Sequence, residues 1–255
     1  MKMIKLSVAI ITFNEEKRIA RCLESVKSMA DEIIVIDSYS TDQTEEICKK
    51  YPVNFIKNKF SGHVEQKNFA LSKTQFEYVL SLDADEVLSD QLMAEITKIK
   101  HDPKFQAYSF NRLTNYNGHW VRYCGWYPDE KVRIINKKFA KWGGANPHDI
   151  IVLDQGIKAK KLSGDLLHYS YDSISSHIEQ TNKFTTIAAK AAYAQGIKSN
   201  WFKIITRPPL KFLRDYFYKL GILDGKYGLI ICVINSLSAF LKYSKIKELQ
   251  EGKNI

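Results

Sequence analysis

The chain has 255 residues, of which 45% are hydrophobic and 26% are charged. This composition excludes a disordered chain, and the length suffices for one large α/β domain with or without an appendage. Residues 1–100 carry 14 Lys/Arg and 16 Asp/Glu, against 24 and 12 in residues 101–255, so the net charge of +10 comes from the second part. That part suits an anionic partner, such as nucleic acid, an acidic membrane surface or a phosphorylated glycolipid, although solvated lysines that keep a protein soluble give the same charge.

Cysteine spacing and apolar runs indicate the compartment. Cys22, Cys48, Cys124 and Cys232 are far apart, which argues against a zinc site or a disulfide scaffold and fits a reducing cytosol. No hydrophobic signal region precedes the first expected strand. The longest apolar run, residues 229–241, is 13 residues long and too short to span a bilayer. We therefore expect a cytoplasmic protein without a transmembrane helix.

The first hundred residues alternate between strand and helix patterns, which is typical of a parallel sheet with right-handed crossovers. The Gly-rich fingerprints of dinucleotide and Walker-type sites are missing, so side chains and a metal would have to hold a nucleotide, and this points to a nucleotide-sugar. The expected strands are residues 6–11, 33–36, 53–56 and 78–82, and the expected helices are residues 18–29, 42–50, one that includes 66–71, and 89–100.

One acidic strand end stands out. The apolar run at residues 78–82 stops at Asp83, Asp85 and Glu86. Ligands of open α/β sheets bind beyond the carboxyl ends of the strands, and Mg²⁺ is usually held by one or two carboxylates together with substrate phosphates. The alternative is that these acids only cap the following helix.

The middle of the chain is rich in aromatic residues, which gather in residues 115–142. Aromatic rings suit the apolar faces of sugars, but a core role is as common, so both remain open for Trp126. Arg133 could hold a phosphate through two hydrogen bonds. Residues 143–149 are expected to form a flexible loop. His168 is either a packed or surface residue or a metal or diphosphate contact.

The end of the chain is helical and basic. Residues 173–195 have a helical pattern, and the chain beyond them mixes aromatic and apolar residues with cations, as an interfacial helix does. A helical hairpin packed on the main domain fits equally well. We expect a domain of residues 1–195, with halves 1–100 and 101–195, followed by a basic, amphipathic tail of residues 196–255.

Four motifs in order resemble the family 2 inverting glycosyltransferases of GT-A fold. The resemblance implies an α/β fold with a Rossmann-like, mostly parallel central sheet, flanking helices and a C-terminal helical extension. Later motifs look like the bacterial lipopolysaccharide inner-core glucosyltransferase subgroup, except that His148-Asp149 stands where the subgroup has His-Glu. The first four motifs lie in residues 8–15, 34–44, 67–70 and 80–86, and the later ones in residues 125–133, 148–149, 168–169 and 221–228.

The resemblance implies a role for each matching residue. It implies a uridine diphosphate (UDP) sugar as donor and Mg²⁺ or Mn²⁺ as cofactor, with a carboxylate as the base that activates the acceptor hydroxyl. The donor residues are Thr12, Glu15 and Asp37 for the base and ribose, with Lys67 beside them and Asp83 at the ribose or the metal's waters; Asp85 binds the metal, with His168 completing the site. The base is Asp149, with Asp129 and Glu86 in reserve, and Trp126, Arg133 and His148 contact the acceptor.

The function implied is transfer of a hexose, glucose first, to a heptose of the lipopolysaccharide core, by an enzyme peripheral at the inner face of the cell membrane. An alternative acceptor is a polyprenyl-linked sugar for capsule or O-antigen. A second alternative is a catalytically silent protein that binds anionic ligands such as nucleic acid. Because no helix-turn-helix or RNA-stacking motif is present, no nucleic acid partner is expected.

Overall fold

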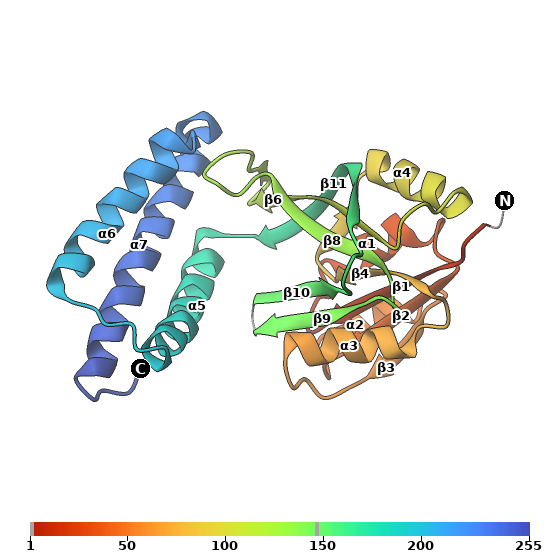
Figure 1. Cartoon of the computed structure of the whole chain (residues 1–255), viewed down its shortest axis with the longest axis horizontal. Helices are drawn as coiled ribbons and strands as arrows, with labels where there is room; N and C mark the ends of the chain where they lie inside the picture. The colour runs from red at the N-terminus through yellow and green to blue at the C-terminus, as the bar shows by residue number, and fades with distance from the viewer. Residues whose placement is uncertain (1–2, 146–147) are drawn as a thin grey trace. The chain divides into compact units, whose positions relative to one another are not determined.

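The computed structural model describes residues 3–145 and 148–255. The chain forms two compact units (Figure 1). Their boundaries differ from the domain boundary expected after residue 195. That expected boundary stays a prediction. The first unit comprises residues 1–112 and 129–169, and the second comprises residues 113–128 and 170–255.

A central sheet organises the first unit, in the order β3-β2-β1-β4-β8-β6-β11-β5. The strands β3, β2, β1 and β4 are parallel to one another, whereas β8 runs antiparallel to β4 and β6, and β11 runs antiparallel to β5. Another strand, β7 (His119–Trp120), pairs with β6. The bounds of the others are β1 (Leu6–Thr12), β2 (Glu32–Asp37), β3 (Asn54–Lys57), β4 (Tyr78–Asp83), β5 (Glu86–Leu88), β6 (Ala107–Tyr116), β8 (Asp129–Asn136) and β11 (Ala159–Tyr171).

Helices cover both faces of this sheet because its strands are apolar on both sides. Val8 and Ile10 pack into one core cluster with residues of α1 and α4, whereas Ala9 and Ile34 pack into another with residues of α3. The expected α/β sheet with flanking helices is therefore confirmed. The helices are α1 (Ile19–Val26), α2 (Thr44–Cys48), α3 (His63–Lys73) and α4 (Asp90–His101).

Two local expectations differ from the structure. Residues 143–149, expected as a flexible loop, belong to an antiparallel pair, β9 (Ala140–Ala145) and β10 (His148–Leu153), with residues 146–147 outside the described part. The β-branched residues of β10 favour this strand. The acids after β4 do not cap α4, because Ser89 caps it by accepting from the Leu92 N–H at 3.3 Å.

The second unit is mainly helical, and α7 packs against both α5 and α6 (Figure 1). Residues 221–250 are long and apolar enough to cross a membrane, and 22% of their most apolar stretch is buried. The 13-residue run lies within this longer helical segment, so its length no longer excludes a span. The elements are α5 (Ile174–Ala194), α6 (Trp201–Leu213), the π-helical turn η1 (Arg214–Tyr218), the 3₁₀ turn η2 (Gly221–Asp224) and α7 (Gly225–Gln250).

The glycine-rich motif of residues 221–228, which spans η2 and the start of α7, is tightly packed. A Cβ on Gly228 would lie 1.8 Å from the carbonyl oxygen of Gly221, so only glycine fits there. Asp224 is buried, accepts from the Tyr123 N–H at 2.8 Å, and lies 3.0 Å from His119 Nε2. This motif therefore has a packing role within the second unit.

Candidate active site

Three parallel strands end at one edge of the sheet, and each ends in a polar residue. In the observed register Thr12 of β1 pairs with Asp37 of β2, and Ile11 pairs with Asp83 of β4. The structure thus brings these polar side chains to the edge where ligands of α/β sheets bind.

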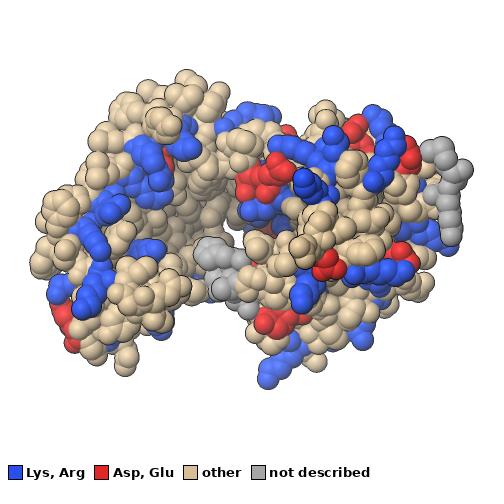
Figure 2. Space-filling model, in the orientation of Figure 1, with Lys and Arg blue, Asp and Glu red and all other residues tan. Residues whose placement is uncertain are grey.

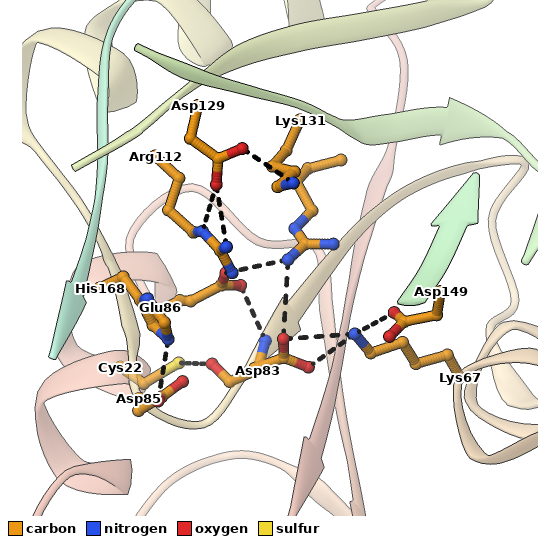
Figure 3. A network of polar contacts seen from close by, with 11 residues as sticks. Cys22, Lys67, Asp83, Asp85, Glu86, Arg112, Asp129, Lys131, Asp149 and His168 are labelled. Carbon is orange, nitrogen blue, oxygen red and sulfur yellow. Dashed lines mark hydrogen bonds and ion pairs between the residues drawn. The ribbon is translucent and has the colours of Figure 1, made fainter. Parts of the chain in front are cut away.

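Asp83 is the centre of a network of ion pairs (Figure 3). Its Oδ1 lies 3.0 Å from Lys67 Nζ and its Oδ2 lies 3.6 Å from Arg133, while its N–H donates to Glu86 at 3.0 Å. Burial opposes ionisation, but Lys67 and Arg133 hold the pKa of Asp83 well below its usual range. Burial and the nearby carboxylates raise the pKa of the Cys22 thiol, which donates to the Asp83 carbonyl at 3.8 Å and stays neutral.

Glu86 and Arg133 form an interior ion pair that contacts Asp83. Glu86 is fully buried, and its Oε1 lies 2.9 Å from Arg133, which is 5% exposed, and 3.7 Å from Arg112. Buried charges need such partners because water does not reach them. This arrangement favours a structural role for both residues over the reserve base and acceptor contact that the sequence indicated.

Lys67 connects Asp83 to Asp149. Its side chain is 4% exposed, and its Nζ lies 2.8 Å from Asp149 Oδ2 and 4.4 Å from the centre of the Trp142 ring. Asn68 holds β9 to α3, because its side chain donates to the Trp142 carbonyl at 2.9 Å and accepts from the Trp142 N–H at 3.0 Å. Two carboxylates far apart in sequence therefore share one cation.

Asp85 and His168 form the candidate metal pair. Their side chains are 21% and 15% exposed, and Asp85 Oδ2 lies 3.1 Å from His168 Nε2. Burial opposes protonation of His168, but Asp85 raises its pKa. The other ring nitrogen, Nδ1, is buried and has no hydrogen-bond partner among the described residues.

This pair fits a metal whose other ligands come from the substrate. Among the described residues, no three of His, Cys, Asp and Glu are grouped closely enough to hold an ion by themselves. Mg²⁺ commonly takes only one or two carboxylates and completes its octahedron with phosphate and water oxygens. Asp85 and His168 are therefore suitable donors for such an ion.

Asp129 lies in a more exposed part of the network. Its side chain is 30% exposed, with Oδ2 2.9 Å from Arg112 and Oδ1 2.9 Å from Lys131. Two cations thus occupy both carboxylate oxygens. This pairing makes Asp129 a less available proton acceptor than Asp149, for which Lys67 is the one ion-pair partner among the described residues.

The residues expected to bind the donor differ in whether their polar groups already have partners. Asp37 is fully buried, and both its oxygens accept hydrogen bonds from Ser40, so it shapes the loop after β2. Glu15 pairs with Arg18 at 3.0 Å. The buried hydroxyl of Thr12 has no hydrogen-bond partner among the described residues, so a ligand could supply one.

Sequence reasoning missed two exposed aromatic residues beside this edge. Phe13 follows the last residue of β1 and is 55% exposed, and Tyr39 lies two residues after β2 and is 57% exposed. The available signal was an aromatic residue immediately beyond an apolar strand.

One expected acceptor residue, Trp126, lies outside the network of the first unit. Trp126 belongs to the second unit, where its ring lies 5.6 Å from those of Tyr171 and His177 and 6.1 Å from that of Tyr116. These contacts fit the core role that the sequence left open, and acceptor contact stays a prediction. The side chain of His148 lies outside the described part of the chain.

Comparisons with known proteins agree with the sequence motifs. The model of Glycosyl transferase family 2 matches residues 7–156. An uncharacterized glycosyltransferase of Rickettsia typhi is 34% identical over 264 residues, covering 99% of this chain and 90% of that protein. The lipopolysaccharide core biosynthesis glycosyltransferase LpsC of Rhizobium meliloti is 27% identical over 254 residues, covering 95% of this chain and 92% of that protein.

Solved structures show a weaker likeness. The crystal structure of S. aureus TarS residues 1–349 in complex with UDP has a TM-score of 0.44 and 15% identity, covering 98% of this chain and 92% of that chain. A TM-score this low supports no conclusion about the site of this chain.

Proposed function

Because the chain belongs to glycosyl transferase family 2, we propose that it moves a hexose, glucose first, from a UDP-sugar to a heptose of the lipopolysaccharide core. The observation that carries this proposal is the network in which Lys67 joins Asp83, at the strand edge, to Asp149 on β10. One carboxylate thus stands at the proposed donor site, and the second, bound to the same cation, is our candidate to meet the acceptor hydroxyl.

Asp149 is the proposed general base. As the acceptor oxygen attacks the anomeric carbon and the bond to the diphosphate breaks, Asp149 takes the hydroxyl proton, and this single displacement inverts the configuration. General-base catalysis contributes about 10²–10⁴-fold. Lys67 orients the Asp149 carboxylate through the 2.8 Å contact.

Asp85 and His168 would hold the divalent ion, Mg²⁺ or Mn²⁺. When bound, such an ion stabilises the negative charge of the departing diphosphate as a Lewis acid. Lys67 and Arg133 already contact the two carboxylate oxygens of Asp83. We therefore assign Asp83 to hydrogen bonds with the ribose or with the metal's waters, and not to direct metal coordination.

The proposed donor site lies at the carboxyl-terminal ends of β1, β2 and β4. The Thr12 hydroxyl has unused hydrogen-bonding capacity, Asp37 pairs with Thr12 at the end of β2, and Glu15 lies on the loop that follows β1. Phe13 and Tyr39 offer exposed rings on which the uracil base can stack.

A lipid-linked acceptor is supported by composition and by likeness. Residues 101–255 carry twice as many cations as acids, which suits a phosphorylated glycolipid. The name of the Rhizobium meliloti relative, 27% identical, refers to lipopolysaccharide core biosynthesis. We place the activity at the inner face of the cell membrane, where a cytosolic donor and a lipid-linked acceptor meet.

A transfer assay tests the proposal. Purified protein is incubated with several UDP-hexoses, with or without Mn²⁺, and with either a heptose-containing core acceptor or a polyprenyl-linked sugar. We expect metal-dependent transfer to the heptose. Transfer to the polyprenyl acceptor alone would reassign the acceptor, and neither transfer nor donor hydrolysis would reject the proposed reaction.

A variant pair tests the base. Asp149→Asn should lower kcat by about 10²–10⁴-fold with little change in donor KM. Asp154→Asn, an exposed acid just beyond the same strand, is the matched control and should keep full activity. Equal losses in kcat and donor affinity would point to another base.

A further inference from the structure

Helix α6 in the second unit has an apolar side that no described part of the chain covers. Its inner side packs on α7, where Ile204 is buried and the Pro208 carbonyl accepts from Ser236 at 2.8 Å. Away from this contact, Phe202 is 73% exposed and Ile205 is 67% exposed. Exposed apolar side chains continue at Trp201, Leu210, Leu213 and Phe217. We call this set, with the cations described next, the α6 surface.

Cations line one flank of the same helix. Lys203, Arg207 and Lys211 are four residues apart, so they lie along one line of α6, and Arg214 follows at the start of η1. Figure 2 shows Lys and Arg side chains in a band over the region of α6, with uncharged side chains on both sides.

The segments that carry this flank, α6 and η1, hold no exposed acid, whereas Glu248 and Glu251 are exposed at the end of α7. Between residues 180 and 247, all of which are described, the chain has two acids, Asp215 and Asp224. Both are buried, and Asp215 pairs internally with Lys211 at 3.3 Å and with Arg214 at 2.7 Å. The α6 surface thus combines apolar side chains and positive charge with no exposed negative charge.

We propose that the α6 surface docks on an anionic lipid bilayer, with its aromatic and aliphatic side chains in the headgroup boundary and its cations on lipid phosphates. The helix has 13 residues, about 20 Å, which is less than the roughly 30 Å hydrocarbon core, so it lies along the membrane. A second copy of the chain is a poorer occupant, because its identical surface offers no exposed carboxylate to these cations.

Vesicle binding tests this surface without requiring turnover, so its failure is separate from failure of the proposed glycosyl transfer. The probes are vesicles of phosphatidylglycerol with phosphatidylcholine and vesicles of phosphatidylcholine alone, measured by co-sedimentation. We expect binding to the anionic vesicles, at least tenfold weaker binding to the neutral ones, and release in 1 M salt, where charge interactions are screened within about 3 Å.

Matched variants locate the contact. Lys203→Gln with Arg207→Gln should weaken partition to anionic vesicles about 25-fold, since each cation near such a surface contributes about fivefold. These two cations are chosen because Lys211 and Arg214 also neutralise buried Asp215. Lys158→Gln with Lys160→Gln, exposed lysines of the first unit, changes the net charge equally and should change partition less than twofold.

The apolar contact has its own readout. Trp201 is 68% exposed, so its fluorescence should shift to shorter wavelength on anionic vesicles, and Trp201→Phe should remove that shift. Equal losses in both double variants, binding that 1 M salt does not reverse, or self-association in place of vesicle binding would each overturn the proposal.

Discussion

Replacing Lys67 by Met tests the cation at the centre of the network. Methionine keeps an unbranched side chain of similar length beside the Trp142 ring but removes the ammonium group. Asp83 and Asp149 then lose the cation that lies 3.0 and 2.8 Å from them. Two carboxylates would remain within one partly buried site, and Arg133 would still lie 3.6 Å from Asp83.

The expected cost follows from burial. Removing one partner of a buried ion pair costs about 3–5 kcal/mol. Because the side chains of Asp83 and Asp149 are 27% and 13% exposed, water offsets part of this cost, and we expect a loss of about 2–3 kcal/mol in the free energy of unfolding. For a chain of this size, that lowers Tm by about 4–12 °C.

The pH dependence of this loss has a definite sign. Lys67 helps to hold the pKa of Asp83 below its usual value, so this stabilisation is present above about pH 3.9 and is lost as pH falls through the folded-state pKa. In Lys67→Met that pKa rises towards its usual value. The stability difference between the two proteins should therefore be largest at neutral pH and shrink below about pH 4.

Urea unfolding and thermal melts at several pH values measure this difference. Lys73→Met is the control, because Lys73 ends the same helix, is exposed, and lies 4.8 Å from a ring, that of Phe69. Adding Asp149→Asn to Lys67→Met should recover about 1 kcal/mol by removing one unpaired charge. A Lys67→Met protein as stable as Lys73→Met at neutral pH would refute the role given to this ion pair.

Two further predictions concern the second unit and the metal pair. Burial lowers the pKa of His177 to about 4. Between about pH 6.5 and pH 4 the unfolded chain therefore binds more protons than the folded chain. The free energy of unfolding should fall by about 3 kcal/mol as the pH is lowered through this range. His177→Phe should flatten this slope in urea unfolding, and an unchanged slope would contradict the assignment. Asp85→Asn should lower metal-dependent transfer by about 10²-fold or more while Tm changes by less than about 4 °C. Normal turnover in that variant would exclude Asp85 as a metal ligand.

The elements of the first hundred residues could be predicted from the sequence because their cause is local, whereas the β9–β10 pair was missed. The apolar runs before Thr12, Asp37 and Asp83 and the helical spacing around Leu23 predicted strands and helices close to those observed. The polar residues at the strand ends could be placed at one edge as well, since parallel strands share the edge at which they end.

The partners within the site could not be predicted in this way. Asp83 and Asp149 meet at Lys67, from which they are 16 and 82 residues distant, and no periodic pattern encodes that contact. Nothing in the motif of three acids showed that Glu86 is fully buried while Asp85 keeps partial access to water.

The sequence by itself determined which chemical groups the chain carries and which segments form strands and helices, because propensity and periodicity act between near neighbours. Only the tertiary structure decided which carboxylates are neutralised by interior cations and which stay available to a ligand, because burial and charge pairing depend on segments that folding brings together.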